Sequence, residues 1–530
     1  MTGPGLAESA PRDYNAAADL IESNLAAGRG GKTAFTDDAG SCTYAELAER
    51  VDRFANALLA LGIEPEQRVV LCLLDGIDFP VAFLGAIKAG IVPVPVNTLL
   101  TRSDYDFILS DSRARALVVS DALLDRFEGA ADRHPGLRHV VVSGAAAPQG
   151  RHRFADLLAA APPRAEAART TRDDVCFWLY SSGSTGSPKG TVHVHASLRR
   201  TADLYAVPVL GIREDDVVYS AAKLFFAYGL GNALTFPMAV GATAVLTAER
   251  PTPALVSRIL RERRPTIFYG VPTLYGALLA SSELPGREEL ALRRCTSAGE
   301  ALPPDLGRRW TERTGVEILD GLGSTEMLHI FLSNHPGEVR YGTSGRPVAG
   351  YRVRIVDEAG NPVPRGEVGE LQVEGPTGAA FYWNNRERSR TTFLGPWTRS
   401  GDKYVETEDG YFVFCGRSDD MLKVGGIYVS PFEVEGALLS HPDVLEAAVV
   451  GQADESGLIK PKAYVVLKPG VIAPDADMAE ALQCHVKERL APFKYPRWIE
   501  FLPELPKTAT GKVQRFKLRA SATPAVQAAG

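Results

Sequence analysis

The chain of 530 residues has no excess of basic charge and no long apolar run. Its 58 Lys and Arg residues face 64 Asp and Glu residues, and the net charge of −6 creates no basic field that would attract nucleic acid. No apolar segment reaches the roughly 18 residues that a membrane span needs. The first 20 residues lack the basic and apolar regions of a secretory signal. These absences predict a cytoplasmic protein that binds neither nucleic acid nor a membrane.

The chain also lacks paired cysteines. Its six cysteines stand far apart and form no C-x-x-C pair; they are Cys42, Cys72, Cys176, Cys295, Cys415 and Cys484. Neither a disulfide framework nor a cysteine metal site is therefore expected, and reduced thiols fit the cytoplasm.

Strand-like and helical segments alternate through the first half of the chain. A helical stretch near 80–89 is one of the helical members, and the strand-like members are 69–74, 91–97, 116–120, 139–143 and 176–180. Alternation of this kind predicts an α/β fold in which helices cover sheets of parallel strands.

The second half has a different character. Shorter segments at 351–357, 369–375 and 410–416 are separated by turn residues and predict a β-rich subdomain with hairpins. After Gly416, residues 447–470 predict two strands and 477–490 a helix, which together form a small α+β domain. We therefore expect three parts: a large N-terminal domain at 1–418, a small mobile domain at 419–520 and a disordered tail at 521–530.

Residues 180–195 read YSSGSTGSPKGTVHVH and carry the first chemical signal. Backbone N–H groups of glycine, hydroxyl groups and the charge of Lys189 suit a polyanion, most simply a phosphate chain. The segment is not a Walker A loop, because Pro188 stands where that motif has glycine before the lysine. A flexible surface loop is the alternative, since glycine and serine runs also serve as linkers.

Further segments matter when they are considered together. They are SAGEALP at 297–303, DGLGSTE at 320–326, SGD at 400–402, GRSDDMLKVGG at 416–426 and PKTATGKVQRFKL at 506–518. Taken singly, Glu326 could support a helix start, Asp402 could close a turn and Lys512 could be a solvated lysine. In this order and spacing, however, the segments resemble the acyl-adenylate-forming superfamily over essentially the whole chain. Within that superfamily, residues 223–232, 323–331 and 422–431 resemble the benzoate-CoA ligases.

The resemblance implies a two-step reaction that uses ATP, CoA and Mg²⁺. A carboxylate attacks the α-phosphate of ATP and gives an acyl-adenylate and pyrophosphate. The thiol of CoA then attacks the carbonyl carbon, and a thioester and AMP are formed. The implied activity is an ATP-dependent aryl-CoA ligase for benzoate or a close analogue, with a role in aromatic acid catabolism.

The resemblance also assigns roles to residues of the nucleotide site. The group that would close over the β- and γ-phosphates, with Lys189 nearby, is Ser181, Ser182, Gly183, Ser184, Thr185 and Gly186. The adenine slot would be lined by Gly299, Glu300, Ala301, Asp320 and Gly321. Thr325 would contact a phosphate, and Glu326 would hold Mg²⁺, which prefers carboxylate oxygen. Asp402 would bind the ribose hydroxyls, and Arg417 would also bind the nucleotide.

Four residues near the C-terminus would divide the two half-reactions. Lys512 would bridge the attacking carboxylate and the α-phosphate in the first step. Asp419 matches the hinge about which the small domain rotates in this superfamily. Gly425 and Gly426 would then let the pantetheine arm of CoA pass close to the backbone.

The aryl acid is expected to lie against six residues, namely Phe226, Ala227, Tyr228, Gly229, His329 and Ile330. No Asp or Glu occurs between Lys223 and Ala248, which argues against an amino-acid substrate with a free ammonium group. Phe226 departs from the His that many ligases of the superfamily carry, but the benzoate-CoA ligases share this aromatic form. Plain core packing is the alternative for Phe225 and Phe226.

His329 leaves the substrate open. It could be a structural histidine that stays clear of the ring, or it could pair with a ring substituent, so hydroxybenzoates and 2-aminobenzoate remain alternatives to benzoate. Less favoured are a medium-chain fatty acid, an aryl-acid loader of a carrier protein and a non-catalytic adenylate-binding protein. The expected partner is a small aromatic carboxylic acid, and the resemblance allows a homodimer.

Overall fold

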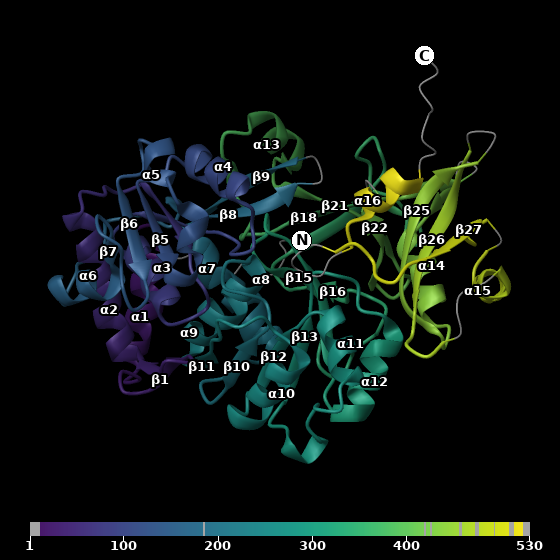
Figure 1. Cartoon of the computed structure of the whole chain (residues 1–530), viewed down its shortest axis with the longest axis horizontal. Coiled ribbons are helices and arrows are strands. Elements are labelled where there is room, and N and C mark those ends of the chain that lie inside the picture. The colour runs from purple at the N-terminus through teal and green to yellow at the C-terminus, as the bar shows by residue number, and fades with distance from the viewer. Residues whose placement is uncertain are drawn as a thin grey trace, which may run out of the picture. The chain divides into compact units, whose positions relative to one another are not determined.

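The structure is a computed structural model that describes residues 11–183, 186–417, 420–424, 427–454, 458–471, 476–491, 493–507 and 513–522. It divides into two compact units. Unit one comprises Met1–Leu302, Leu306–Val353 and Val373–Arg399, and unit two comprises Pro303–Asp305, Arg354–Gln372 and Ser400–Gly530. The predicted α/β class is confirmed (Figure 1). None of the helices in these ranges is both long enough and apolar enough to cross a membrane.

A five-stranded parallel sheet lies in unit one, in the order β4-β3-β5-β6-β7. Its strands are β3 (Arg68–Cys72), β4 (Val92–Pro95), β5 (Ala116–Ser120), β6 (His139–Ser143) and β7 (His152–Arg153). The first four coincide with predicted strands, and α3 (Asp78–Lys88) matches the predicted helix. Every residue of α3 after Asp78 is buried, because this helix is apolar on all sides and has no solvent face.

A nine-stranded sheet forms the other large layer of unit one, in the order β16-β15-β14-β13-β12-β10-β11-β1-β2. Its successive strands are β1 (Thr33–Thr36), β2 (Ser41–Thr43), β10 (Val217–Ser220), β11 (Thr243–Val245), β12 (Ile267–Gly270), β13 (Arg294–Ser297), β14 (Ile318–Gly323), β15 (Ile330–Ser333) and β16 (Arg346–Pro347). Strands β1, β11, β10, β12, β13 and β14 are parallel. Strand order is therefore set by crossovers through helices such as α10 (Pro253–Glu262), α11 (Pro272–Ala280) and α12 (Pro304–Thr314).

The phosphate-loop segment folds differently from the prediction. Strand β8 (Val175–Gly183) continues three residues past the predicted end at Tyr180, and β9 (Gly186–Val194) returns antiparallel to it. The connection is too short for the crossover that parallel strands require. After β9, helix α7 (His195–Thr201) passes directly into the π-helical segment η2 (Ala202–Leu210).

The remaining helices of unit one flank these sheets. They are α1 (Ala16–Ala26), α2 (Tyr44–Ala60), α4 (Arg102–Ser112), α5 (Ala130–Arg133), α6 (Phe154–Ala160), α8 (Ala227–Leu230), α9 (Phe236–Val240) and α13 (Arg386–Thr392). Helix α2 begins at a capping box in which the Thr43 side chain bonds the Glu46 backbone and Glu46 bonds back, so its start is specified locally.

Unit two contains the predicted β-rich and α+β parts. The three predicted β-rich segments correspond to β17 (Arg352–Val356), β18 (Gly369–Glu374) and β22 (Phe412–Arg417), and β22 pairs with β21 (Trp397–Glu406). The two strands predicted at 447–470 are β25 (Val444–Ala453) and β26 (Ile459–Leu467), with β27 (Trp498–Phe501) parallel to β26. Helices α14 (Pro431–Leu439) and α15 (Ala476–Lys487) supply Val434, Leu482 and Val486 to their common core.

Three short elements complete unit two as described. Strand β23 (Leu422–Val424) pairs with β24 (Ile427–Val429), and α16 (Arg515–Ala522) follows near the end. The predicted domain boundary at 418–419 and most of the predicted tail, residues 523–530, lie outside the described residues. Both stay predictions.

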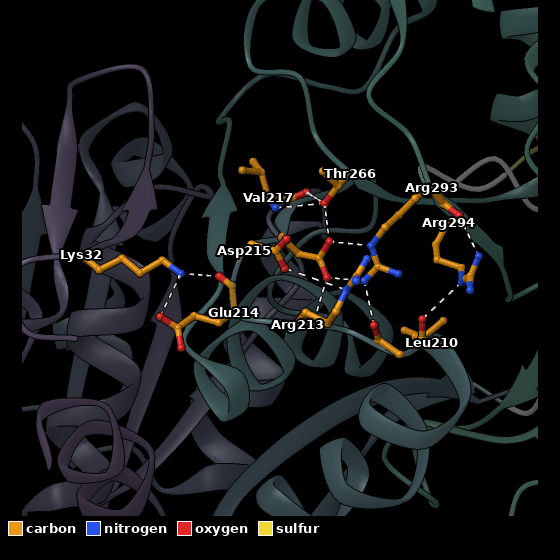
Figure 2. A network of polar contacts seen from close by, with 11 residues as sticks. Lys32, Leu210, Arg213, Glu214, Asp215, Val217, Thr266, Arg293 and Arg294 are labelled. Carbon is orange, nitrogen blue, oxygen red and sulfur yellow. Dashed lines mark hydrogen bonds and ion pairs between the residues drawn. The ribbon is translucent and has the colours of Figure 1, made fainter. Parts of the chain in front are cut away.

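A buried carboxylate ties the amino ends of three parallel strands together, and Figure 2 labels its partners Arg213, Thr266 and Arg293. The side chain of Asp216, which precedes β10, is 2% exposed. Its Oδ1 accepts from Arg293 Nε and from Thr266 Oγ1, both at 2.7 Å, and its Oδ2 accepts from Arg293 Nη2 and from the Arg213 N–H. Thr266 precedes β12 and Arg293 precedes β13, so one side chain joins the starts of β10, β12 and β13.

We expect Asp216→Ala to destabilise unit one by about 3 kcal/mol, because removing one partner of a buried ion pair leaves the other charge uncompensated. Thermal unfolding at neutral pH should show a midpoint several degrees lower. Asp215→Ala is the matched control, since its side chain is 81% exposed and 3.9 Å from Arg213; it should change stability by less than about 0.5 kcal/mol. Equal shifts for the two variants would contradict this role for Asp216.

The same network predicts a pH dependence. Burial acts to raise the pKa of Asp216, but the hydrogen bonds from Arg293 and Thr266 outweigh it and lower this pKa below its ordinary value of 3.8. The stabilisation is therefore present above that value and is lost as the pH falls through the folded-state pKa. The difference in melting temperature between wild type and Asp216→Ala should shrink below about pH 4.

Candidate functional site

The predicted site segments gather where the parallel strands of the nine-stranded sheet end. The segment 221–229 follows β10, 298–301 follows β13 and 320–330 includes the end of β14. Carboxyl ends of parallel strands meet at one edge, and such edges are the usual ligand positions of open α/β sheets. The edge tied by Asp216 is the opposite one.

The tip of the β8–β9 hairpin carries backbone groups and the buried hydroxyl of Ser181. Gly183 pairs with Gly186 and Ser181 with Lys189 across the hairpin. Ser181 Oγ is buried and has no hydrogen-bond partner among the described residues. Ser184 and Thr185 lie outside these residues, and the side chain of Ser182 is likewise not described. A buried hydroxyl without a partner fits an incoming phosphate oxygen, since an unsatisfied group of this kind is otherwise costly.

Lys189, Glu326 and Tyr382 form a contact group that joins this hairpin to the end of β14. Lys189 Nζ lies 3.9 Å from Glu326 Oε1, and each of the two side chains is 16% exposed. The Tyr382 hydroxyl donates to the same Oε1 at 2.6 Å, and Lys189 Nζ lies 4.7 Å from the Tyr382 ring centroid. A partly buried carboxylate with one oxygen fixed is a suitable hard ligand for Mg²⁺, so Glu326 fits the ion that the resemblance implies.

Tyr382 was not identified from the sequence. It belongs to the short strand β19 (Phe381–Tyr382), which pairs with β9, and it lies 56 positions from its partner Glu326. Nothing in the stretch Phe-Tyr-Trp distinguishes a functional tyrosine from one in the core.

The chain around Glu326 is held by its own carbonyl groups. The three successive carbonyls of residues 325–327 accept hydrogen bonds at 2.7–2.8 Å, in order from His193 Nε2, the Ala379 N–H and Thr377 Oγ1. The next residue, Leu328, is buried with a φ of 66°, a left-handed conformation that a leucine adopts at a cost. The hydrogen bonds to residues 325–327 thus fix the bend at Leu328. This bend lies between Glu326 and His329 in the chain.

The residues predicted to line the adenine slot include one buried acid, Asp320, and the more exposed residues 299–301. Asp320 is 4% exposed, and burial raises its pKa well above the ordinary range. Its Oδ1 has no partner among the described residues. Gly321 has no room for a side chain, since a Cβ would lie 2.7 Å from the Leu332 carbonyl oxygen. By contrast, Gly299 (φ 93°) and Ala301 are exposed and Glu300 is half-buried.

The predicted aryl-acid segment follows a turn at residues 224–225 and forms the start of helix α8. Phe226, Ala227 and Tyr228 are half-buried, whereas Phe225 is 6% exposed and packs against Phe226 with ring centroids 4.5 Å apart. Of the two phenylalanines, Phe225 is therefore a core residue, whereas Phe226 is not. Tyr228 Oη lies 2.6 Å from Thr296 Oγ1, which fixes the ring at the end of β13.

His329 is 3% exposed and lies among three aromatic rings. Its ring centroid is 4.4 Å from that of Phe236 and 5.5 Å from those of Tyr205 and Tyr228. Nε2 lies 3.3 Å from the Tyr228 carbonyl oxygen and 3.2 Å from Asn232 Oδ1. Both can accept, so we assign the ring proton to Nε2. Nδ1 is then a bare acceptor, with no partner in the part of the chain that is described.

Ile330 is 1% exposed and begins β15, where it pairs with Gly323 of β14. In unit two, Asp402 and Arg417 are cross-strand partners on β21 and β22, and Arg417 Nη1 donates to Asp402 Oδ1 at 2.8 Å. The Asp402 carboxylate is 9% exposed. Asp419, Gly425, Gly426 and Lys512 lie outside the described residues.

Comparisons with known proteins place this geometry in context. The family model described as AMP-binding enzyme matches residues 23–383, and the model described as AMP-binding enzyme C-terminal domain matches 433–512. A benzoate–CoA ligase of Thauera aromatica is 63% identical over 513 residues, which are 96% of this chain and 97% of that protein. A 4-hydroxybenzoate–CoA/benzoate–CoA ligase of Rhodopseudomonas palustris is 52% identical, over 96% of this chain and 94% of its own length.

Among solved structures, a benzoate CoA ligase from Burkholderia xenovorans LB400 is 58% identical and superposes with a TM-score of 0.89. The match covers 96% of this chain and all of that one. The similarity thus extends over both units.

The contacts of His329 predict that it stays neutral with the proton on Nε2. Burial lowers its pKa from 6.5 to about 3, so it should not titrate between pH 5 and 8. Nitrogen-15 spectra of histidine-labelled protein, with the signal assigned by its loss in His329→Asn, should show this single tautomer throughout. A signal that titrates near pH 6.5, or a proton on Nδ1, would refute the assignment.

Proposed function

The chain belongs to the AMP-binding enzyme family, and on that premise we propose that it is an ATP-dependent aryl-CoA ligase that converts benzoate or a close analogue to its CoA thioester. The observation that carries the proposal is the high identity, over nearly the whole chain, to ligases named for benzoate. The aromatic segment 225–228, which lacks any acidic residue, supports a flat uncharged ring as the recognised group.

In the first half-reaction an oxygen of the aryl carboxylate attacks the α-phosphorus of ATP. The bond between the α-phosphorus and the bridging oxygen breaks, and pyrophosphate leaves. The β8–β9 hairpin and Lys189 would bind the departing phosphates with backbone N–H groups, the Ser181 hydroxyl and a positive charge. Mg²⁺, when bound, would neutralise phosphate charge, and Glu326, whose carboxylate is oriented by the Tyr382 hydroxyl, would hold it.

In the second half-reaction the sulfur of CoA attacks the carbonyl carbon, AMP leaves and the thiol proton is released. Adenylation is needed because a carboxylate resists nucleophiles, whereas the mixed anhydride carries a good leaving group. Asp402 and Arg417 would bind the nucleotide, and Lys512 would serve the first half-reaction alone. Rotation about Asp419 would then bring Gly425 and Gly426 to the pantetheine arm.

A second candidate substrate is a hydroxybenzoate or 2-aminobenzoate. The bare Nδ1 of His329 favours it, since an acceptor in an apolar site can pair with a ring hydroxyl or amino group. A relative that is 52% identical is named for both 4-hydroxybenzoate and benzoate.

The wider setting is also proposed. The six cysteines are free, which suits a reducing cytoplasm, and an aryl-CoA product would enter the catabolism of aromatic acids. A homodimer is the proposed assembly state, and sedimentation velocity would test it.

The first test is ATP–pyrophosphate exchange with CoA omitted. The acids compared would be benzoate, its hydroxy and amino derivatives at positions 2, 3 and 4, phenylacetate and octanoate. We expect exchange to be fastest with benzoate. Fastest exchange with a substituted ring would instead support the second candidate, and no exchange with any acid would refute the proposed function.

The division between half-reactions gives a second test. Lys512→Ala should slow adenylation by ~10²–10³-fold, since it removes a preorganised charge, and should spare thioester formation from a supplied aryl-adenylate. Gly425→Leu should do the reverse, because a side chain would obstruct the pantetheine arm. Each variant is the control for the other. Equal losses in both half-reactions would contradict the division.

A further inference from the structure

A buried carboxylate outside the reacting groups touches the start of the aryl-acid segment. Asp75 follows β3 and is 5% exposed. Its Oδ1 and Oδ2 accept from the Leu224 N–H at 3.2 and 3.3 Å, across 149 positions of sequence. Burial raises the pKa of Asp75 to about 6, and the charge of Lys223 together with this hydrogen bond opposes the shift.

The neighbouring residue Lys223 anchors the same part of the chain through its side chain. Its Nζ donates to the carbonyl oxygens of Thr247 at 2.5 Å and Glu249 at 2.7 Å, which belong to the chain just after β11. Burial lowers the pKa of Lys223, while the charge of Asp75 acts to raise it. Residues 223 and 224 are therefore fixed both by a backbone contact to Asp75 and by a side-chain contact to the chain after β11.

The aromatic turn folds back onto these two fixed residues. The Phe226 N–H donates to the Lys223 carbonyl oxygen at 3.0 Å. At Gly229, a Cβ would lie 2.1 Å from that same oxygen and 2.5 Å from the Ala222 carbonyl oxygen, so the turn closes directly on the fixed point. Any shift of residues 223–224 would move Phe226, Ala227 and Tyr228 with them.

Stability alone is a poor explanation for Asp75. A carboxylate taken out of water and matched mainly to one backbone N–H is costly, and an apolar residue of similar size would fill the space. We infer that Asp75 and Lys223 are positioning residues that hold the aryl-acid segment 225–229 in its binding shape before substrate arrives, and so determine which rings fit. The inference rests on the proposed function.

The test measures KM separately for the acid and for ATP in the full chain. Asp75→Ala should raise KM for benzoate about tenfold or more, the effect expected when a hydrogen bond to a charged group is lost. KM for ATP should change by less than about twofold, and the preference for benzoate over 4-methylbenzoate should fall. Lys223→Met, which keeps the aliphatic stem and removes the donors, should act in the same direction and carries the test if Asp75→Ala does not fold.

Two variants serve as controls. Asp75→Asn keeps an acceptor and the shape, so it should restore KM for benzoate to within about threefold of wild type. Asp78→Ala removes another carboxylate of the same chain region, whose Oδ2 accepts from Ser143 Oγ at 2.6 Å and does not touch the aryl segment. It should leave KM for benzoate unchanged.

Three results would overturn the inference. They are an equal rise of both KM values in Asp75→Ala, the same acid-specific effect in Asp78→Ala, and unchanged kinetics in Asp75→Ala. Wild-type exchange with benzoate and an unaffected Asp75→Ala would reject the inference alone. Absence of exchange in the wild type with every acid would reject the proposed function itself.

Discussion

The parallel pairing of β10, β12, β13 and β14 is the constraint on which the site depends. Parallel strands must start at one edge and end at the other, so the strand pairing itself brings the chain segments after β10, β13 and β14 to the same edge. The polar groups at the two edges of the sheet differ in their hydrogen bonding. Asp216 joins the strand starts through a network whose polar groups are matched, whereas the strand ends carry polar groups that the described protein leaves unmatched.

Matched and unmatched polar groups lie side by side in the candidate site. The carbonyls of residues 325–327 each accept a hydrogen bond, and they hold the strained bend at Leu328. The Ser181 hydroxyl, Asp320 Oδ1 and His329 Nδ1 are buried and lack a partner among the described residues. Since an unmatched buried polar atom is unfavourable, a ligand that supplies the missing partner gains more than it would from a solvated group. Unmatched atoms next to rigidly matched backbone are therefore what a preorganised site requires.

Sequence reasoning recovered the elements whose signal is local. The alternating strands 69–74 and 116–120, the helix near 80–89 and the paired strands of 447–470 depend on periodicity, and each was found within a few residues. The antiparallel return of β9 was missed, because glycine and serine mark a loop but do not reveal that strands continue into it. Glu326 was found through its motif. Tyr382 and Asp75 were not, because each acquires its meaning from a contact 56 or 149 positions away, which no local pattern records.

The protonation state of His329 bears on which ring substituents the proposed site can accept. His329 is held neutral by burial, and its Nε2 proton is already committed to Tyr228 and Asn232, so the imidazole can offer a ring substituent only an acceptor. An acceptor in an apolar setting discriminates between substituents that donate and those that do not, such as a hydroxyl and a methyl group of similar size. An unsubstituted ring leaves Nδ1 without a partner. Because Nδ1 also lacks a partner among the described residues when no ligand is bound, this adds no further cost. With the ring placed against His329 as proposed, benzoate and a correctly placed hydroxybenzoate would share one pocket, whereas a methyl group would fill the same space with no partner for Nδ1. Selectivity among aryl acids would then follow from how firmly the segment 225–229 is held, because only a rigid binding surface converts a small difference in size into a difference in affinity.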